Sequence, residues 1–334
     1  MQSRYHITTV ESHTEGMPTR VVTGGIAPIP GATMSVRRDW AKKNLDWLRG
    51  MLMNEPRGHA AMSGAILMSP TRSDADWGVL YIEATGFLPM CGHGTMGVAT
   101  VLVEAGLVEV VEPVTTIRLD TPAGLVIARV ETRQGRALRV TLENVPALVL
   151  GLNQSVDTPS FGTVTYDMVY GGNFYPVIDV TRLGLAIETD QKEALMAAGR
   201  EVIAAINATH PPEHPGNKSI RMLHHAQFTT PWEAPPAEAL NAVFTLPGYF
   251  DRSPCGTGTS ARMACLHARG LLAVGETFTN TSMIGSSFEG RILRIESLEG
   301  HVAVIPEVSG RAWVTGTASY MLAPDDPFPA GFTI

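Results

Sequence analysis

Two cysteines, Cys91 and Cys255, stand at the start of two similar helical patterns that lie 164 residues apart in the chain. The first stretch reads MCGHGTMGVATVLVEAGLV and the second reads PCGTGTSARMACLHARGLL. Both contain the five-residue pattern C-G-x-G-T, and the identity resumes further along at a leucine and at a Gly-Leu pair. The chain therefore builds the same helix start twice.

A helix start of this composition combines an anion site with a reactive thiol. The first N–H groups of a helix have no partner within the helix, and the helix dipole makes this end positive. Such an end binds a carboxylate or a phosphate, and glycines let the ligand come close to the backbone. A cysteine placed there has a stabilised thiolate, so its pKa falls below the free value of about 8.5.

Two such starts acting on one substrate would suit the inversion of an α-carbon. One thiolate, from Cys91 or Cys255, would remove the proton while the opposite thiol delivers one, and the charge of the carbanion would spread into a clamped carboxylate. We expect four backbone N–H groups to hold that carboxylate, those of Gly92, His93, Gly256 and Thr257. Cys91 and Cys255 are thus the predicted catalytic residues.

Other interpretations of the cysteines fit less well. A lone cysteine before a helix is more often a small buried hydrophobe than a base, but two in the same frame reverse that preference. Cys265 lies ten residues into the second helical pattern, where the first has Val101, and is expected to be a packed core thiol.

The motifs disfavour the common cofactors. CGTGTS lacks the G-K-[ST] ending of a P-loop, and no C-x-x-C or H-E-x-x-H spacing supports a zinc site or a dithiol redox role. Pyridoxal phosphate would need a Schiff-base lysine, but the lysines lie in polar contexts typical of a surface: Lys42, Lys43, Lys192 and Lys218. We predict no cofactor and no metal.

The elements that position these motifs are mostly strands. Short runs such as YHITTV, WGVLYIEA and LVIARVET alternate apolar and polar residues, which is typical of half-buried antiparallel strands. Helical patterns are fewer, and we expect them at residues 39–52, 94–105, 190–208 and 258–269. The balance indicates an α+β fold rather than a regular βαβ alternation.

Length and composition bound the remaining possibilities. A chain of 334 residues favours two domains, and a boundary near Val145–Val156 predicts a first domain over residues 1–150 with Cys91 and a second over 151–321 with Cys255. A net charge of −7 argues against nucleic-acid binding. No apolar run is long enough for a signal peptide or a membrane span, and three cysteines cannot all pair. We therefore expect a cytoplasmic enzyme; a homodimer is left open.

At this point the sequence resembles a known family. MCGHGTMG and DRSPCGTGTSAR are similar to the two signature motifs of the proline racemase family, which includes hydroxyproline 2-epimerases. Further similar segments are SHTEGMPTRVVTGG, EPRGHAAMSGAIL, YGGNFYPVID and DDPFPAGFTI, so the resemblance spans nearly the whole chain. It implies a fold of the diaminopimelate-epimerase type, with two pseudo-symmetric domains, each a curved, mostly antiparallel sheet around a central helix. The active site would lie in the interdomain cleft, and residues 322–334 would return to the first domain.

The resemblance also implies roles for further residues. Cys91 and Cys255 would be the acid/base pair, Asp251 would hold the ring ammonium of the substrate, and a histidine, for which we favour His225 over His224, would contact the substrate. Three residues inside matched motifs have no assigned role, namely His13, His59 and Asn173. Met17 is a departure, because many relatives have Glu at this position.

The resemblance implies cofactor-free epimerisation of a small imino acid, proline or hydroxyproline. Because both cysteines are present, we expect an epimerase that converts trans-4-hydroxy-L-proline to cis-4-hydroxy-D-proline. The alternatives are a proline racemase and a trans-3-hydroxy-L-proline dehydratase or epimerase. The dehydratase ranks second because relatives that dehydrate usually replace one cysteine with Ser or Thr. An alternative of another class is a non-catalytic imino-acid-binding protein on the same scaffold.

Overall fold

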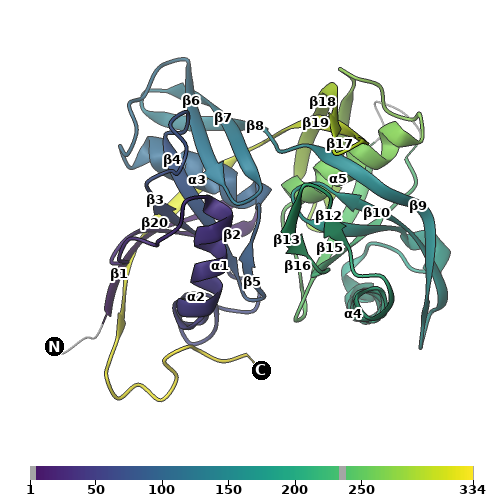
Figure 1. The fold of residues 1–334 in the computed structure, drawn as a ribbon, viewed down its shortest axis with the longest axis horizontal. Helices are drawn as coiled ribbons and strands as arrows, with labels where there is room; N and C mark the ends of the chain where they lie inside the picture. Colours follow the sequence, from purple (N-terminus) through teal and green to yellow (C-terminus); the bar gives the residue numbers. More distant parts are fainter. Residues whose placement is uncertain (1–4, 233–237, 334) are drawn as a thin grey trace. The chain divides into compact units, whose positions relative to one another are not determined.

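The computed structural model describes residues 5–232 and 238–333 of the chain (Figure 1). The chain divides into two compact units, one of Met1–Leu142 with Gly310–Ile334 and one of Glu143–Ser309. The end of the chain thus belongs to the same unit as its beginning.

Three antiparallel hairpins make the sheet of the first unit: β1 (Tyr5–Thr14) with β2 (Met17–Gly24), β3 (Ser63–Met68) with β4 (Trp77–Glu83), and β6 (Val114–Thr121) with β7 (Gly124–Arg133). Successive hairpins join through parallel pairs, β2 with β3 and β4 with β6. Three further strands complete the unit: β20 (Ala312–Leu322) beside β1, the short β5 (Gly86–Leu88) beside β4, and β8 (Arg136–Glu143), which leads into the second unit.

Three antiparallel hairpins in the same order make the sheet of the second unit: β10 (Gly162–Tyr170) with β11 (Phe174–Asp179), β14 (His225–Thr229) with β15 (Glu238–Thr245), and β17 (Thr277–Ser282) with β18 (Ser287–Leu298). The parallel joints recur between β11 and β14 and between β15 and β17. β9 (Ala147–Thr158) lies beside β10, and β19 (His301–Gly310) lies beside β18. β19 also pairs with β9, with Ala303 opposite Leu148, so this sheet closes into a ring.

The same sequence of elements leads to each cysteine. In the first unit β5 precedes Cys91 and helix α3 (Gly92–Glu104); in the second, β16 (Tyr249–Phe250) pairs with β15 and precedes Cys255 and helix α5 (Gly256–Ala268). Residues from Gly92 to Val103 in α3 and from Gly256 to Leu266 in α5 are all buried, because each sheet curves around its helix. A helix enclosed on all sides needs small and apolar residues all round rather than one apolar stripe.

The other helices cover the outer face of each sheet. α1 (Met34–Asn44) and α2 (Asp46–Met53) lie between the first two hairpins of the first unit, and α4 (Lys192–Thr209) has the same place in the second. Three short elements accompany α4: the 3₁₀ turns η1 (Val180–Leu183) and η2 (Thr189–Gln191) and a small hairpin of β12 (Glu213–His214) with β13 (Asn217–Arg221). This repeated order of strands and helices confirms the α+β prediction.

Three of the four predicted helices are confirmed within two residues, and the fourth is wrong as a single helix. Instead of one helix over 39–52, α1 begins at Met34, where Thr33 accepts a hydrogen bond from the N–H of Val36, and α2 follows after a break at Leu45. Leu45 has φ −124° and ψ 14°, outside the helical range. Ala41 of α1 and Leu48 of α2 both lie in the core of the first unit.

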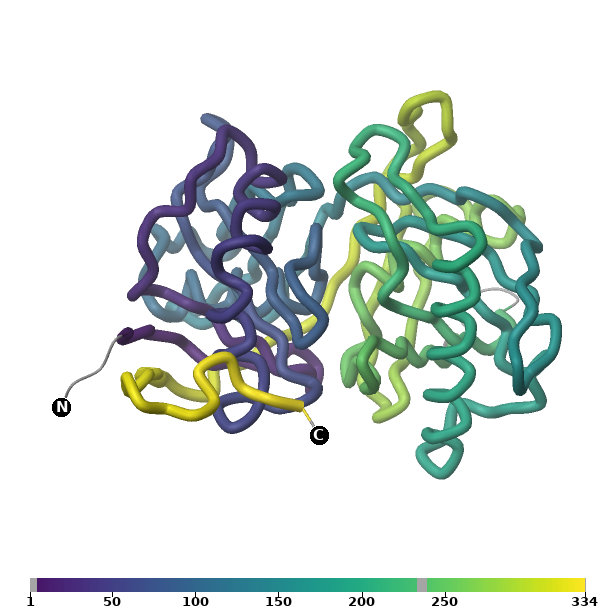
Figure 2. Tube along the Cα trace, turned by 60° about the horizontal axis from the view of Figure 1, so that its bottom comes forward, coloured from purple at the N-terminus to yellow at the C-terminus, as the bar shows by residue number. Residues whose placement is uncertain are grey.

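The C-terminal segment is anchored on the first unit. Asp326 forms an ion pair with Arg57, and the N–H of Phe332 donates to the carbonyl of Glu55 at 2.8 Å. Figure 2 shows this segment, in yellow, lying along the purple and blue N-terminal part of the chain. Within the described residues, no helix is both long and apolar enough to cross a membrane.

Candidate active site: two cysteine half-sites

Cys91 is the N-cap of α3 and lies in the short connection between β5 and this helix. Its backbone is extended (φ −145°, ψ 112°), and its carbonyl accepts the N–H of Thr95 at 2.9 Å, the first helical bond. The side chain is buried. A Cβ added at Gly94 would lie 2.9 Å from the sulfur, so the second glycine of the pattern is the residue that makes room for the thiol.

An imidazole lies against the sulfur of Cys91. The Sγ atom is 3.6 Å from Nδ1 and 3.5 Å from Nε2 of His93, two nearly equal distances that place it over the ring rather than in line with one N–H. Nε2 of His93 lies 3.0 Å from the hydroxyl of Ser63, and the carbonyl of His93 accepts the hydroxyl of Thr14 at 2.8 Å. Ser63 on β3 thus holds the ring beside the thiol, and Thr14 on β1 holds the backbone of the same residue.

A carboxylate completes the polar group around Cys91. Ligand atoms of Glu83, Cys91 and His93, all buried, lie within 4.8 Å of one another, which is close enough for one metal ion. This set has the thiolate and imidazole donors that zinc prefers. The same sulfur cannot serve as a base while it binds a metal, so the cluster bears directly on the expectation of a metal-free site.

Cys255 is the N-cap of α5, but its backbone differs from that of Cys91. Its φ of 64° and ψ of 104° are strained for a residue with a Cβ. The sulfur turns onto its own helix and accepts the N–H of Gly258 at 3.4 Å. A Cβ at Gly258 would lie 3.2 Å from that sulfur.

Hydroxyl groups, not an imidazole, surround the sulfur of Cys255. The phenol oxygen of Tyr175 lies 3.4 Å from Sγ and 2.6 Å from the hydroxyl of Thr257, which is itself 3.7 Å from Sγ. The amide of Asn173 donates to the Thr257 hydroxyl at 3.4 Å. Thr257 occupies the same place in its motif as His93 does in the first, two residues after the cysteine.

The loop before Cys255 is fixed by buried amides and by Asp251. Asn241 and Asn280 donate to the carbonyl of Pro254 at 2.7 and 3.2 Å, and the carboxylate of Asp251 accepts the N–H and the hydroxyl of Ser253, each at 2.8 Å. Burial raises the pKa of the Cys255 thiol well above its usual value, and the negative charge of Asp251 adds to the rise, while the hydrogen bonds from Tyr175, Gly258 and Thr257 oppose it.

His225, at the start of β14, lies within the Cys255 group. Its ring stacks on that of Tyr175 with centroids 5.4 Å apart, and Nδ1 is 3.1 Å from the hydroxyl of Thr245. The neighbouring His224 is exposed. Among the matched-motif residues, Asn173 belongs to the Cys255 group.

The remaining matched-motif residues do not join either cysteine through the contacts found. His13 stacks on Trp313 and accepts the N–H of Gly16, whereas His59 is exposed and accepts the N–H of Ala61. Met17 is fully buried.

Four residues of these groups were missed by sequence reasoning. Tyr175 and Ser63 fall inside the matched segments YGGNFYPVID and EPRGHAAMSGAIL, which was the available signal, but nothing local marks them as neighbours of a cysteine. Glu83 and Tyr81 lie on β4; the phenol of Tyr81 is 2.6 Å from the Thr95 hydroxyl, and burial raises its pKa.

Comparison with known proteins places this geometry in a family. The model of the proline racemase family matches residues 9–333. The chain belongs to the proline racemase family. A curated relative, the 4-hydroxyproline 2-epimerase of Streptosporangium roseum, is 56% identical over 325 residues, which are 97% of either chain. The proline racemase of Acetoanaerobium sticklandii is 40% identical over 326 residues, again 97% of either chain.

A solved structure of the family agrees with the fold described above. The crystal structure of a hydroxyproline epimerase from Agrobacterium vitis, with bound trans-4-hydroxy-L-proline, is similar with a TM-score of 0.96 and 34% identity. The match covers 100% of this chain and 96% of that one. The resemblance stated from the sequence is thereby confirmed at the level of family and fold.

Proposed function

We propose that this proline racemase family member is a cofactor-independent epimerase that converts trans-4-hydroxy-L-proline to cis-4-hydroxy-D-proline. The observation that carries the proposal is the duplicated half-site. In each unit a short strand is followed by a buried cysteine that caps a buried helix, and a glycine three residues later makes room for the sulfur. The 56% identity to a protein named 4-hydroxyproline 2-epimerase favours this substrate over proline.

In the proposed reaction the two cysteines exchange one proton each with the substrate. The thiolate of one takes the proton from Cα, the electron pair of the C–H bond passes to Cα and its carboxylate, and the thiol of the other donates a proton to the opposite face. The product leaves with inverted configuration, and the two cysteines are left with their protonation states exchanged. The reverse reaction restores them.

The helix starts would hold the carboxylate. The first N–H groups of α3 and α5, those of Gly92, His93, Gly256 and Thr257, are the donors we propose, since a helix start favours an anion most when charge grows on it. Asp251 would bind the ring ammonium of the substrate, and His225, beside Tyr175, would contact the substrate ring. Because the charge of Asp251 raises the pKa of Cys255, an ammonium bound to Asp251 would make that thiol easier to ionise.

Deuterium incorporation at Cα in D₂O tests the proposal. We expect trans-4-hydroxy-L-proline to exchange and invert, and Cys91→Ser and Cys255→Ser to lower the rate by at least about 10³-fold, as expected for removal of an acid/base group. Cys265→Ser is the matched control: this third thiol, also buried, donates to Asp167 at 3.0 Å, a bond that a serine retains, so activity should hold.

The alternatives give different outcomes in the same assay. Faster exchange with L-proline would identify a proline racemase, and loss of water from trans-3-hydroxy-L-proline alone would identify a dehydratase. Tight binding of an imino acid without exchange at Cα would refute catalysis and support a binding protein.

Independence from metals is tested separately. We expect full activity after treatment with EDTA, and inhibition by added Zn²⁺ through Glu83, Cys91 and His93. His93→Gln should weaken this inhibition. Activity that disappears with EDTA and returns with a metal would contradict the cofactor-free reaction.

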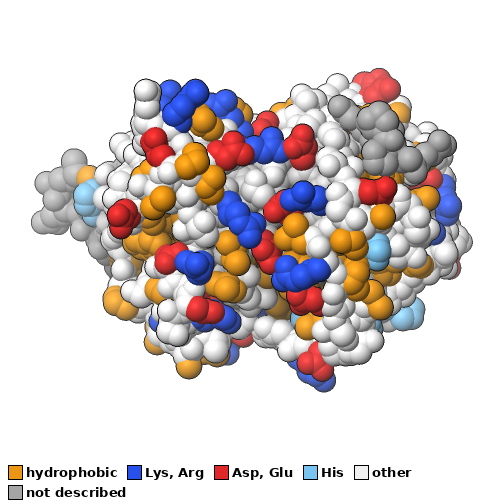
Figure 3. Space-filling model, turned by 90° about the horizontal axis from the view of Figure 1, so that it is seen from above, with side chains coloured by type: hydrophobic (Ala, Val, Ile, Leu, Met, Phe, Trp, Pro, Cys, Tyr) orange, Lys and Arg blue, Asp and Glu red, His pale blue; other side chains and the backbone are white. Residues whose placement is uncertain are grey.

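The proposed setting is a reducing compartment, the cytoplasm, since Cys91, Cys255 and Cys265 are all free thiols. Figure 3 shows basic, acidic and hydrophobic side chains interspersed on one face, whereas nucleic-acid binding usually gathers basic residues together. The partner we propose is therefore a small molecule alone. A homodimer stays a prediction.

A further inference from the structure

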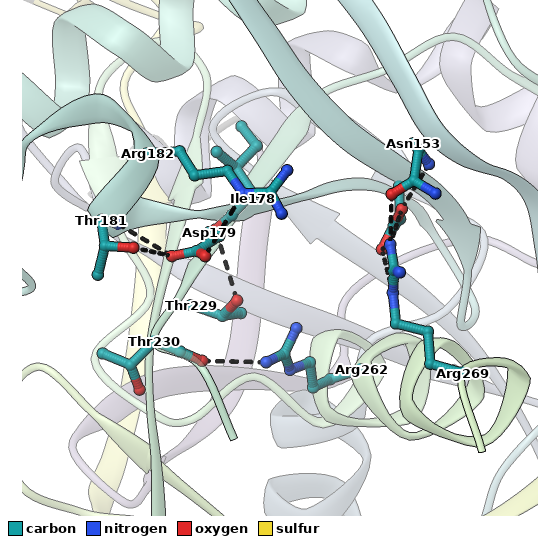
Figure 4. A network of polar contacts seen from close by, with 10 residues as sticks. Asn153, Ile178, Asp179, Thr181, Arg182, Thr229, Thr230, Arg262 and Arg269 are labelled. Atoms are coloured by element: carbon teal, nitrogen blue, oxygen red, sulfur yellow. Dashed lines mark hydrogen bonds and ion pairs between the residues drawn. The ribbon is translucent and has the colours of Figure 1, made fainter. Parts of the chain in front are cut away.

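The second unit contains a cavity of about 230 Å³ that belongs to neither cysteine group. Its walls come from β10, β11, β14 and the C-terminal half of α5, the opposite end of that helix from Cys255. Three arginines line it: Arg262 and Arg269 come from α5 and its C-cap, and Arg182 comes from η1 (Figure 4).

Two of these arginines already have a carboxylate. Arg269 pairs with Asp167 at 2.7 Å through two nitrogens, and Asp167 also accepts the thiol of Cys265. Arg182 lies 3.6 Å from Asp179, whose carboxylate also accepts the N–H and hydroxyl of Thr181. Both acids are therefore committed to other groups.

Arg262 is different. Its side chain reaches inward from α5 and is 9% exposed, and its Nη2 donates to the carbonyl of Thr230 at 3.0 Å (Figure 4). Its Nε has no hydrogen-bond partner among the residues that the structure describes. Burial lowers its pKa, but a guanidinium keeps its proton in proteins. A buried charge without a counter-ion is costly, so three guanidiniums facing two carboxylates leave one positive charge to be balanced.

We propose that this cavity binds a small organic monocarboxylate whose oxygens pair with Arg262. One negative charge matches the one unbalanced guanidinium, and a planar guanidinium suits a carboxylate geometrically. A volume of about 230 Å³ corresponds to about eight water molecules at roughly 30 Å³ each, which is room for a small molecule. Trp232, Leu266 and Leu271 supply an apolar wall for a carbon body that inorganic phosphate lacks.

Benzoate, compared with inorganic phosphate, is the probe. The thermal midpoint of the full chain is measured with 4-hydroxyproline present in excess, so that carboxylate binding near the cysteines is already saturated. We expect benzoate at about a hundred times its Kd to raise the Tm of the wild type by about 5 °C and phosphate to raise it less. Arg262→Met should keep or increase the Tm without benzoate, since it removes an unbalanced charge, and should lose the benzoate shift.

A second pair of variants guards against misfolding of Arg262→Met. Arg182 is largely exposed, and Arg182→Gln would release Asp179 to balance Arg262, so the affinity for benzoate should fall at least about tenfold. Arg294→Gln is the matched control: Arg294 is also half-exposed and ion-paired, with Glu143 and Glu296, but lies outside the cavity. Four outcomes would each overturn the proposal. They are equal benzoate shifts in the wild type and Arg262→Met, equal benzoate affinities of the wild type, Arg182→Gln and Arg294→Gln, a larger shift with phosphate than with benzoate, and no shift at all. None of these outcomes bears on exchange at Cα.

Discussion

The Cys91 and Cys255 half-sites share a backbone frame and differ in the chemistry around the sulfur. Both cysteines cap a buried helix after a short strand, and both have a glycine three residues later against the thiol. The residue two positions after the cysteine is His93 in one and Thr257 in the other. An imidazole and the carboxylate of Glu83 thus lie beside the first sulfur, whereas hydroxyls surround the second and the charge of Asp251 acts on it.

The two half-sites therefore share their backbone arrangement but not the side chains that determine the protonation of each sulfur. Burial and the charge of Asp251 both favour the neutral thiol of Cys255. Cys255 is therefore the cysteine that we predict to hold its proton at rest. The strained backbone of Cys255, at φ 64°, adds a second asymmetry.

After replacement of a cysteine itself, the largest effect should come from filling the space beside the sulfurs. A Cβ at Gly94 would lie 2.9 Å from Sγ of Cys91, and one at Gly258 would lie 3.2 Å from Sγ of Cys255. Displacing a reacting atom by about 1 Å can cost about 10²-fold, so Gly94→Ala should lower kcat by about that factor and Gly258→Ala by less. Gly316→Ala, where no atom lies within 4 Å of the added Cβ, is the control. Equal activity in all three would show that the glycines do not position the thiols.

Alkylation tests the assignment of base and acid. At pH 7 without substrate, iodoacetamide should modify Cys91 at least about tenfold faster than Cys255, because the raised pKa of Cys255 keeps it as the unreactive thiol. The two side chains are 3% and 6% exposed, so access does not favour Cys91. Peptide mass spectrometry gives both rates, with buried Cys265 as the internal control. Faster labelling of Cys255 would reverse the assignment.

A smaller effect is expected at Tyr175. Tyr175→Phe removes a hydrogen bond that lowers the pKa of Cys255, so kcat should fall about fivefold and the alkaline limb of the pH–kcat/KM profile should move to higher pH. Tyr81→Phe is the counterpart in the other half-site, since the Tyr81 phenol bonds Thr95 and not the sulfur. A profile that moves equally in both variants would argue against a specific role for Tyr175.

The smallest effect concerns alkaline stability. Above about pH 8.5 an unfolded cysteine loses its proton, while folded Cys255, with its raised pKa, keeps it. The folded state then binds more protons, so the free energy of unfolding falls as pH rises, by up to about 1.4 kcal/mol per pH unit. Urea unfolding at pH 8 and pH 10 should show a smaller fall in Cys255→Ser than in the wild type. Cys265, whose pKa burial raises to about 12, contributes equally to both proteins; an unchanged fall would contradict the raised pKa of Cys255.

The cysteines were predictable from sequence because each motif is local. The capping cysteine, the glycines and the start of the helix lie within a few residues of one another. The repeated C-G-x-G-T pattern therefore indicated both half-sites and predicted the starts of α3 and α5 within two residues. Tyr175 could not be placed in this way, because it lies 80 residues before Cys255 and reaches it through the sheet. The parallel register of β11 and β14, with Val177 opposite Gln227, is what brings Tyr175 beside His225.

The break between α1 and α2 escaped prediction for a related reason. Residues 39–52 have a continuous helical pattern, with Ala41 and Leu48 on the same face, so nothing in the pattern marks the non-helical backbone of Leu45. Cavity residues were equally hidden: Arg262 reads as an ordinary helical arginine, and only the ring of strands around α5 makes it buried.

The closed ring of the second unit has a consequence for assembly. Because β19 pairs with β9, each of its strands in the ring, β9, β10, β11, β14, β15, β17, β18 and β19, has a neighbour on both sides. A sheet without a free edge has no unpaired N–H and C=O row to offer another chain. Within the described residues, a strand of a second copy could therefore pair only outside the closed part of the ring, at the β12–β13 hairpin or along β9 beyond its two-residue pairing with β19.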